Sequence, residues 1–192
     1  MKRVVVVGTS CSGKTTYARQ LARSLNVSHI ELDAIHWQSN WRPRSVESFR
    51  KLVRSIVETD CWVLDGNYNV VQDIVWGKAT RIIWLNYPFL LVFWRALRRT
   101  VTRVFKKVEL FSGNRETFKH AFLSKDSILW WVLTTFQSRR RQYQTLFTGS
   151  KYPHLTYIEL RNSHEAEVLI NQITSLIDRK RRKSGGSRVD EN

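Results

Sequence analysis

The segment from Gly8 to Thr15 has the residue types and the spacing needed to bind the phosphates of a nucleotide. It reads Gly-Thr-Ser-Cys-Ser-Gly-Lys-Thr, which fits the pattern G-x-x-x-x-G-K-[ST] and directly follows an apolar run. In this pattern the glycines let backbone N–H groups surround the β-phosphate, the lysine reaches the β and γ oxygens, and the hydroxyl ligates Mg²⁺. The sequence therefore predicts an ATP and Mg²⁺ site, formed by Gly8, Ser10, Ser12, Gly13, Lys14, Thr15 and Thr16.

Two aspartates come directly after predicted strands. Asp33 follows the apolar residues 29–32, and Asp65 follows residues 62–64. Ligands bind beyond the carboxyl ends of the strands in open α/β sheets, so we expect both carboxylates to face the phosphate loop. We assign Asp65, with Thr15, to Mg²⁺. For Asp33 three roles stay open: accepting the proton of an attacking hydroxyl, orienting an acceptor, or capping the following turn.

Arginines are concentrated in the second half of the chain. Residues 95–151 contain 13 Lys and Arg against three acids. Arg95, Arg99 and Arg103 recur at i, i+4 and i+8 and so share one helix face. Guanidinium groups suit the oxygens of a transferred phosphoryl group, whereas the alternative is a solvated basic face. We expect catalysis to involve Lys14, Asp33, Arg95, Arg99 and, from the run 139–141, Arg139.

Aromatic residues are the third candidate group. His36, Trp37 and Trp41 could stack on a base, with Arg42 or Arg44 meeting its phosphate, or they could be core residues. Trp130 and Trp131 are interpreted as helix packing.

The elements that must position these residues alternate between strands and helices. Five short apolar runs have the near-continuous Val, Ile, Leu and Trp content of strands covered on both faces. They are residues 4–7, 29–32, 62–64, 81–85 and 155–160. Amphipathic helices are expected at 14–25, from 46 to 56, from Pro88 to about 104, within 115–147 and at 164–177. Such alternation predicts an α/β fold with a parallel sheet.

Composition limits the class of protein further. The chain has 192 residues, 42% of them apolar, with only three prolines and eight glycines, which excludes a disordered or collagen-like chain. The net charge of +16 favours anionic partners, including nonspecific contact with nucleic acid through the basic surface. Two cysteines are too few for a disulfide framework, and no apolar stretch approaches transmembrane length. We therefore expect a cytoplasmic protein without a transmembrane segment.

The chain resembles P-loop small kinases of the adenylate kinase group, and more closely the family of DNA topology modulation proteins. The resemblance rests on the segments GTSCSGKT, ELDAIHW, WVLDGNY and RIIWLNYP, and it covers about residues 1–175. It implies a three-layer αβα fold with a five-stranded parallel sheet in the order 2-3-1-4-5. It also implies an acceptor-binding insert at about 34–60 and a helical lid insert at about 104–115. We predict a P-loop kinase domain over residues 1–178, followed by a basic disordered tail at 179–192.

Three functions stay open from the sequence. The first is an ATP- and Mg²⁺-dependent phosphotransferase acting on a small acceptor, with a nucleoside monophosphate as the expected acceptor. The second is an ATP-binding regulatory protein that contacts DNA. The third is a small kinase of a hydroxylated metabolite, as in shikimate-kinase-like or gluconate-kinase-like enzymes, with Asp33 as the base.

Overall fold

The core of the computed structural model is a five-stranded parallel sheet. The structure describes residues 2–105, 111–113, 127–149 and 151–185. The strand order is β2 (Ser28–Glu31), β5 (Trp62–Asp65), β1 (Arg3–Gly8), β6 (Arg81–Leu85) and β7 (Thr156–Leu160). All neighbouring pairs in this sheet are parallel, so the predicted 2-3-1-4-5 order is confirmed.

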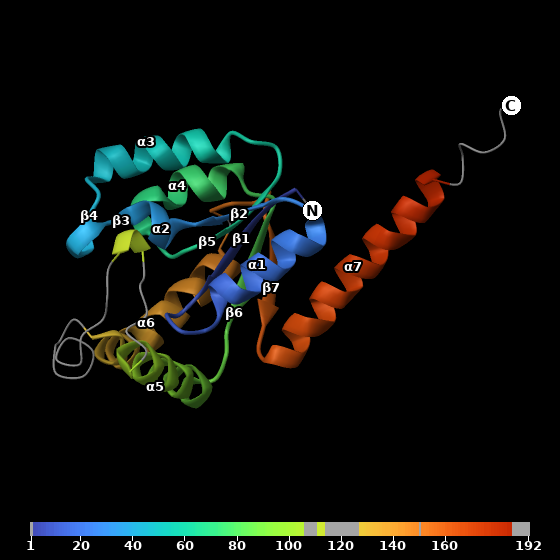
Figure 1. Cartoon of the computed structure of the whole chain (residues 1–192). Coiled ribbons are helices and arrows are strands. Elements are labelled where there is room, and N and C mark those ends of the chain that lie inside the picture. The colour runs from blue at the N-terminus through green and yellow to red at the C-terminus, as the bar shows by residue number, and fades with distance from the viewer. Residues whose placement is uncertain (1, 106–110, 114–126, 150, 186–192) are drawn as a thin grey trace, which may run out of the picture.

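Helices cover both faces of the sheet, as the buried strand pattern predicts (Figure 1). Along β1, Val4 and Val6 pack against α1 (Lys14–Leu25) and α7 (Ser163–Gly185). Val5 and Val7 point the other way, toward α3 (Val46–Val57) and α4 (Asn69–Lys78). One apolar cluster lies on each face of the sheet, so the sheet and the helices on its two sides form three layers. The fold class is therefore confirmed as three-layer α/β.

Two further helices stand side by side next to the sheet. Helix α5 (Phe89–Phe105) packs on α6 (Ile128–Thr148), and the Phe89 and Phe136 rings meet edge to face at 5.2 Å. The first half of α6 joins the α1 and α7 cluster through Val132, while Tyr143 in its second half joins the α3 and α4 cluster. Helix α6 thus connects the two layers of helices.

The predicted acceptor insert contains a small hairpin. After β2 the chain forms α2 (Leu32–His36), then β3 (Trp37–Gln38), the 3-10 turn η1 (Ser39–Trp41) and β4 (Arg42–Pro43), before α3 begins. Ser45 caps α3 by accepting a hydrogen bond from the Ser48 N–H at 3.3 Å. The prediction that the strand reaches residue 32, with Asp33 directly after it, is wrong. The strand β2 ends at Glu31, and Asp33 lies in the short helix that follows it.

The predicted lid at 104–115 is described only in part. Residues 104 and 105 are the end of α5, and 111–113 form a 3-10 turn, η2 (Phe111–Gly113); residues 106–110, 114 and 115 lie outside the described residues. The Ser112 hydroxyl donates to the Trp37 carbonyl at 3.0 Å, and the Ser39 hydroxyl donates to the Ser112 carbonyl at 3.2 Å. This turn therefore contacts the hairpin of the acceptor insert.

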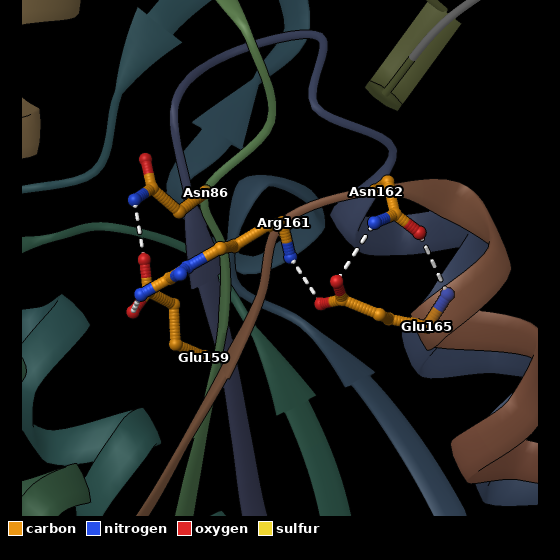
Figure 2. Close-up of polar contacts among 5 residues, drawn as sticks. All are labelled: Asn86, Glu159, Arg161, Asn162 and Glu165. Carbon is orange, nitrogen blue, oxygen red and sulfur yellow. Dashed lines mark hydrogen bonds and ion pairs between the residues drawn. The ribbon is translucent and has the colours of Figure 1, made fainter.

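Helix α7 begins in a network of polar contacts and extends further than predicted. Figure 2 shows Asn162 and Glu165 capping each other: the Glu165 N–H donates to Asn162 Oδ1 at 2.9 Å, and Asn162 Nδ2 donates to Glu165 Oε1 at 2.7 Å. The helix continues to Gly185, so residues 179–185 are helical and the predicted start of the disordered tail at 179 is wrong. Arg and Lys are strong helix formers, and neither Gly nor Pro interrupts residues 163–184. Residues 186–192 lie outside the described residues.

Across residues 2–105, 111–113, 127–149 and 151–185, no helix combines the length and the apolar content that a membrane span requires.

Candidate active site

The phosphate loop connects β1 to α1, as the sequence predicts. Gly13 precedes α1 with a φ of 94°, a left-handed conformation that L side chains rarely adopt. A Cβ on Gly8 would lie 2.8 Å from Ser12 Oγ and 2.9 Å from the Leu85 carbonyl oxygen, so this position also requires glycine. The loop thus packs tightly between the ends of two central strands. Its backbone N–H groups start a twelve-residue helix, which is a favourable place for phosphate.

Lys14 is partly buried at the centre of this loop. Its ammonium group donates to the Thr9 carbonyl at 2.9 Å, which folds the side chain back over the loop. Burial lowers the pKa of Lys14, although the charges of Asp33 and Asp65 act in the opposite direction. A phosphate arriving in the loop would add negative charge beside this cation.

Thr15 and Asp65 meet at the end of the sheet. The Thr15 hydroxyl donates to Asp65 Oδ2 at 2.7 Å, and it is 3.4 Å from Glu31 Oε1. The parallel register places Asp65 opposite Val6 of β1 and Glu31 of β2, which explains why three strands contribute to one site. The hydroxyl and carboxylate oxygens are ligands that Mg²⁺ prefers, together with the phosphates of its nucleotide. The donor set therefore fits the predicted metal.

His29 and Glu31 are site residues that the sequence analysis does not identify. His29 Nε2 lies 2.7 Å from Asp65 Oδ1, so both oxygens of Asp65 have a protein partner. Burial, together with the charges of Asp65 and Asp33, raises the pKa of Glu31. The sequence contains a pattern that could have identified them. His29 and Glu31 are two residues apart on one strand, so their side chains point to the same face. Among the described residues, no three His, Cys, Asp or Glu side chains group closely enough to hold a metal ion unaided.

Asp33 also lines the cleft and is held by Tyr68. The Tyr68 hydroxyl donates to Asp33 Oδ1 at 2.7 Å. Burial and the neighbouring Asp33 charge raise the pKa of Tyr68, so it stays a hydrogen-bond donor at neutral pH. The preceding Gly66 has a φ of 143°, and a Cβ there would lie 2.6 Å from Leu32 Cβ. Glycine at this position lets the α2 segment approach the turn after β5, which brings Asp33 to Tyr68.

The predicted arginines on α5 and α6 line one cleft beside the loop. Arg95 donates to the Ser12 carbonyl and to Ser163 Oγ, both at 2.9 Å. Arg99 lines the same cleft, and its Nε is buried without a hydrogen-bond partner within the described part of the chain. Arg139 enters the cleft from α6 and donates to Gln142 Oε1 at 3.2 Å. Arg103 also lines the cleft, whereas Arg140 and Arg141 do not.

Four tryptophans line the cleft. Two of them, Trp37 and Trp41, have their ring centroids 5.7 Å apart and meet edge to face. Trp130 and Trp131 are 50% and 47% exposed and also line the cleft, so their interpretation as helix packing is wrong. The core contacts of α6 are instead made by Val132, Phe136 and Tyr143. Arg42 and Arg44 are outside the lining of the cleft, and Arg44 Nε donates to the Ile35 carbonyl at 3.0 Å.

Comparison with known proteins bears on the fold. No family model matches the chain, and no curated protein is similar to it. Among solved structures, the chain is similar to shikimate kinase from Acinetobacter baumannii in complex with shikimate, with a TM-score of 0.56 and 14% identity over 94% of each chain. The shikimate kinase from Bacteroides thetaiotaomicron has a TM-score of 0.52 and 16% identity, covering 92% of this chain and 98% of that one. A gluconokinase from Sinorhizobium meliloti 1021 has a TM-score of 0.50 and 16% identity, covering 93% and 97%.

The chain has the fold of the P-loop small kinases. The predicted fold is therefore confirmed at this level. The narrower resemblance to the DNA topology modulation family stays a prediction, as do the roles of the individual site residues.

Proposed function

We propose that this protein transfers the γ-phosphoryl group of ATP, with Mg²⁺, to a small acceptor. The observation that carries the proposal is the 2.7 Å contact between Thr15 Oγ1 and Asp65 Oδ2 beside the partly buried Lys14. Thr15 and Asp65 would hold the metal and Lys14 would bind phosphate, beside the start of one helix, which supports the proposal. The likeness to shikimate kinases and a gluconokinase supports the same reaction class.

The roles in the transfer follow from position and charge. Lys14 would bind the β and γ oxygens of the donor, and Thr15 and Asp65 would hold Mg²⁺, which neutralises charge on those oxygens. Arg99 has a guanidinium nitrogen without a partner among the described residues, and it faces the loop from α5. Arg95 supports the loop by donating to the Ser12 carbonyl. A cation that acts on the developing charge has the largest effect when it is held in place before the reaction.

A nucleoside monophosphate is the first acceptor that we propose. Its base would meet the aromatic wall of the cleft, where four tryptophans are exposed to varying degrees: Trp37, Trp41, Trp130 and Trp131. Its phosphate would meet Arg139, which lines the same cleft from α6. An acceptor phosphate is ionised near neutral pH, so the transfer needs positioning and cations more than a base.

A hydroxylated metabolite is the second candidate, and Asp33 favours it. The carboxylate lies in the cleft with one oxygen bonded to Tyr68, which fixes its orientation toward an acceptor. A hydroxyl acceptor must lose a proton, and a carboxylate at this place can take it. Arg42 and Arg44, which the sequence predicts as phosphate ligands, are outside the cleft lining. No observation of the structure favours the DNA-binding alternative, which stays a prediction.

One measurement separates these candidates. Release of ADP from ATP and Mg²⁺ is followed in the presence of a panel of nucleoside monophosphates and a panel of hydroxylated metabolites, with Lys14→Ala as the matched inactive control. Stimulation by a monophosphate alone supports the first acceptor, and stimulation by a hydroxylated compound alone supports the second. Tight ATP binding without stimulation by either panel would contradict the phosphotransferase proposal and favour a regulatory protein.

A further inference from the structure

Helix α5 has an apolar stripe on the side that faces away from the protein. Leu90, Trp94, Leu97, Val101 and Phe105 recur at steps of four, three, four and four residues, which places them on one face. Leu90 is 78% exposed, Trp94 62% and Phe105 80%. Figure 1 shows α5 at the edge of the molecule, on the opposite side from α3. Large apolar side chains gathered in this way mark a surface that another body covers.

The rest of α5 is already occupied. Val92, Ala96 and Thr100 form its buried face, against the sheet and α6. Arg95, Arg99 and Arg103 turn toward the cleft. Within the part of the chain that the structure describes, the stripe is therefore a third face, used neither by the core nor by the site.

The charges beside the stripe limit what can cover it. Helix α5 contains four arginines and no acid, and Arg98, which is exposed and outside the cleft lining, borders the stripe near its middle. In a twofold pair of α5 helices centred on Leu97, the Arg98 side chains of the two copies would lie close together with no acid on either helix to compensate. The chain as a whole carries a net charge of +16, which adds to this repulsion.

We propose that this stripe docks on the surface of an anionic phospholipid bilayer. Helices that lie in the membrane interface combine Trp, Phe and Leu on one face with Arg or Lys beside them, and α5 has this arrangement. Trp94 and Phe105 would enter the boundary between headgroups and acyl chains, while Arg98 would meet lipid phosphates. The helix lies on the surface and does not cross it. The cleft, on another face of α5, stays open to solvent, so the proposal is independent of the proposed activity.

Binding to vesicles tests the proposal with the full-length protein. Vesicles of phosphatidylcholine and vesicles containing 30% phosphatidylglycerol are sedimented with the wild-type chain, with Trp94→Gln/Phe105→Gln and with Arg98→Gln. The matched control is Leu176→Gln, which removes a leucine that is 57% exposed on α7. The unfolding temperature and the ATP affinity establish that each variant is folded. Because the altered side chains are exposed, we expect these two quantities to equal those of the wild type.

The expected result is partition onto the anionic vesicles only. The double variant should lower the partition coefficient roughly tenfold or more, Arg98→Gln a few-fold, and Leu176→Gln not at all. Equal partition of the double variant and the wild type would overturn the proposal in favour of general basic adsorption. A concentration-dependent dimer in solution that Trp94→Gln/Phe105→Gln abolishes would overturn it in favour of a second copy of the chain.

Discussion

The two ends of the cleft differ in how many of their side chains already have protein partners. The donor end is the part around Lys14, Thr15 and Asp65, and the acceptor end is the part around Trp130 and Trp131. At the donor end, Lys14, Thr15 and Asp65 are bound to protein partners at 2.7 to 2.9 Å, and Asp65 is buried. At the acceptor end, the side chains of Trp130 and Trp131 are about half exposed. Under the proposed function, the donor end would hold one invariant group, the phosphates of the nucleotide. The acceptor end would receive a ligand that supplies further contacts.

Removing the central cation of the donor end should have the largest effect. In Lys14→Ala, the transfer rate is expected to fall by roughly 10²- to 10³-fold, because Lys14 is the one charged side chain of the phosphate loop, residues 8–15. The fold should survive, since the variant loses a partly buried cation rather than an apolar core contact. ADP release and thermal unfolding, measured on the same preparation, check both statements. A folded variant with unchanged ADP release would contradict the assignment of the phosphate loop.

The two aspartates should separate the two ends. Asp65→Asn is expected to reduce turnover about 10²-fold and to raise the Mg²⁺ concentration needed for half-maximal rate. Asp33→Asn should instead change the response to the acceptor, because Asp33 is bonded to Tyr68 and not to Thr15. Magnesium and acceptor titrations of both variants provide the measurement. If the two variants showed equal shifts in the magnesium titration and equal shifts in the acceptor titration, the two aspartates would not have separate roles.

His29 gives a finer test of the donor end. It is placed 2.7 Å from Asp65 Oδ1, and groups that orient a metal ligand are commonly worth about 10- to 100-fold in metal affinity. His29→Ala is expected to weaken Mg²⁺ binding by about tenfold. His29→Gln, which keeps a donor nitrogen, should recover part of the loss. Direct binding of Mn²⁺ as a probe, without turnover, reports this affinity. Equal affinity in the wild type and His29→Ala would assign His29 to packing alone.

The acceptor end should respond to smaller changes. Trp131→Ala is expected to raise the KM for the stimulating acceptor by roughly 2- to 10-fold with kcat unchanged, the range of one aromatic contact. Thr134→Ala is a suitable control because it lies one turn of α6 away and lines the same cleft. If Trp131→Ala lowered kcat and left KM unchanged, Trp131 would belong with the catalytic groups instead.

The donor end of the cleft could be predicted from the sequence more fully than the acceptor end. The phosphate loop is contiguous, and the apolar runs define the strands within about one residue, so Lys14, Thr15 and Asp65 could be placed from the sequence. The predicted strand order already places β2 beside β5, but the contact between His29 and Asp65 also depends on the register of these two strands, which tertiary packing sets. An amphipathic pattern also does not reveal which helix residue faces a cleft, so the sequence alone favours the helix-packing interpretation of Trp130 and Trp131.

The prediction that a disordered tail begins at residue 179 was wrong for a related reason. A run of Arg and Lys is typical of disordered ends, but the same residues are strong helix formers when a well-capped helix precedes them. Asn162 and Glu165 provide that cap for α7, 14 or more residues before the predicted boundary at 179. Composition alone does not contain this information, because the helix is nucleated elsewhere.

The smallest expected effect concerns Glu31, where the donor end should be more stable without its charge. Burial first, and then the charges of Asp65 and Asp33, raise the pKa of Glu31 in the folded chain. A carboxyl group whose pKa is higher in the folded chain than in the unfolded chain lowers the free energy of unfolding when it is ionised. This loss of stability is fully present above the folded pKa, and it disappears as the pH falls below the unfolded pKa. Glu31→Gln is therefore expected to raise the Tm by about 2 °C at pH 7 and to leave it unchanged near pH 3.

The matched control for this last prediction is Glu47→Gln, an exposed acid in the first turn of α3. Its removal should not raise the Tm, because an acid at a helix N-terminus is favourable there. Added Mg²⁺ and ATP should reverse the ranking of Glu31→Gln and the wild type, since a bound cation stabilises the ionised Glu31 and binding adds to the stability of the folded state. A Tm for Glu31→Gln below that of the wild type at pH 7 without ligand would show that Glu31 supports the fold through its contact with Thr15. The negative charge at the end of β2 would then be structural, and the donor end would be stable without its metal.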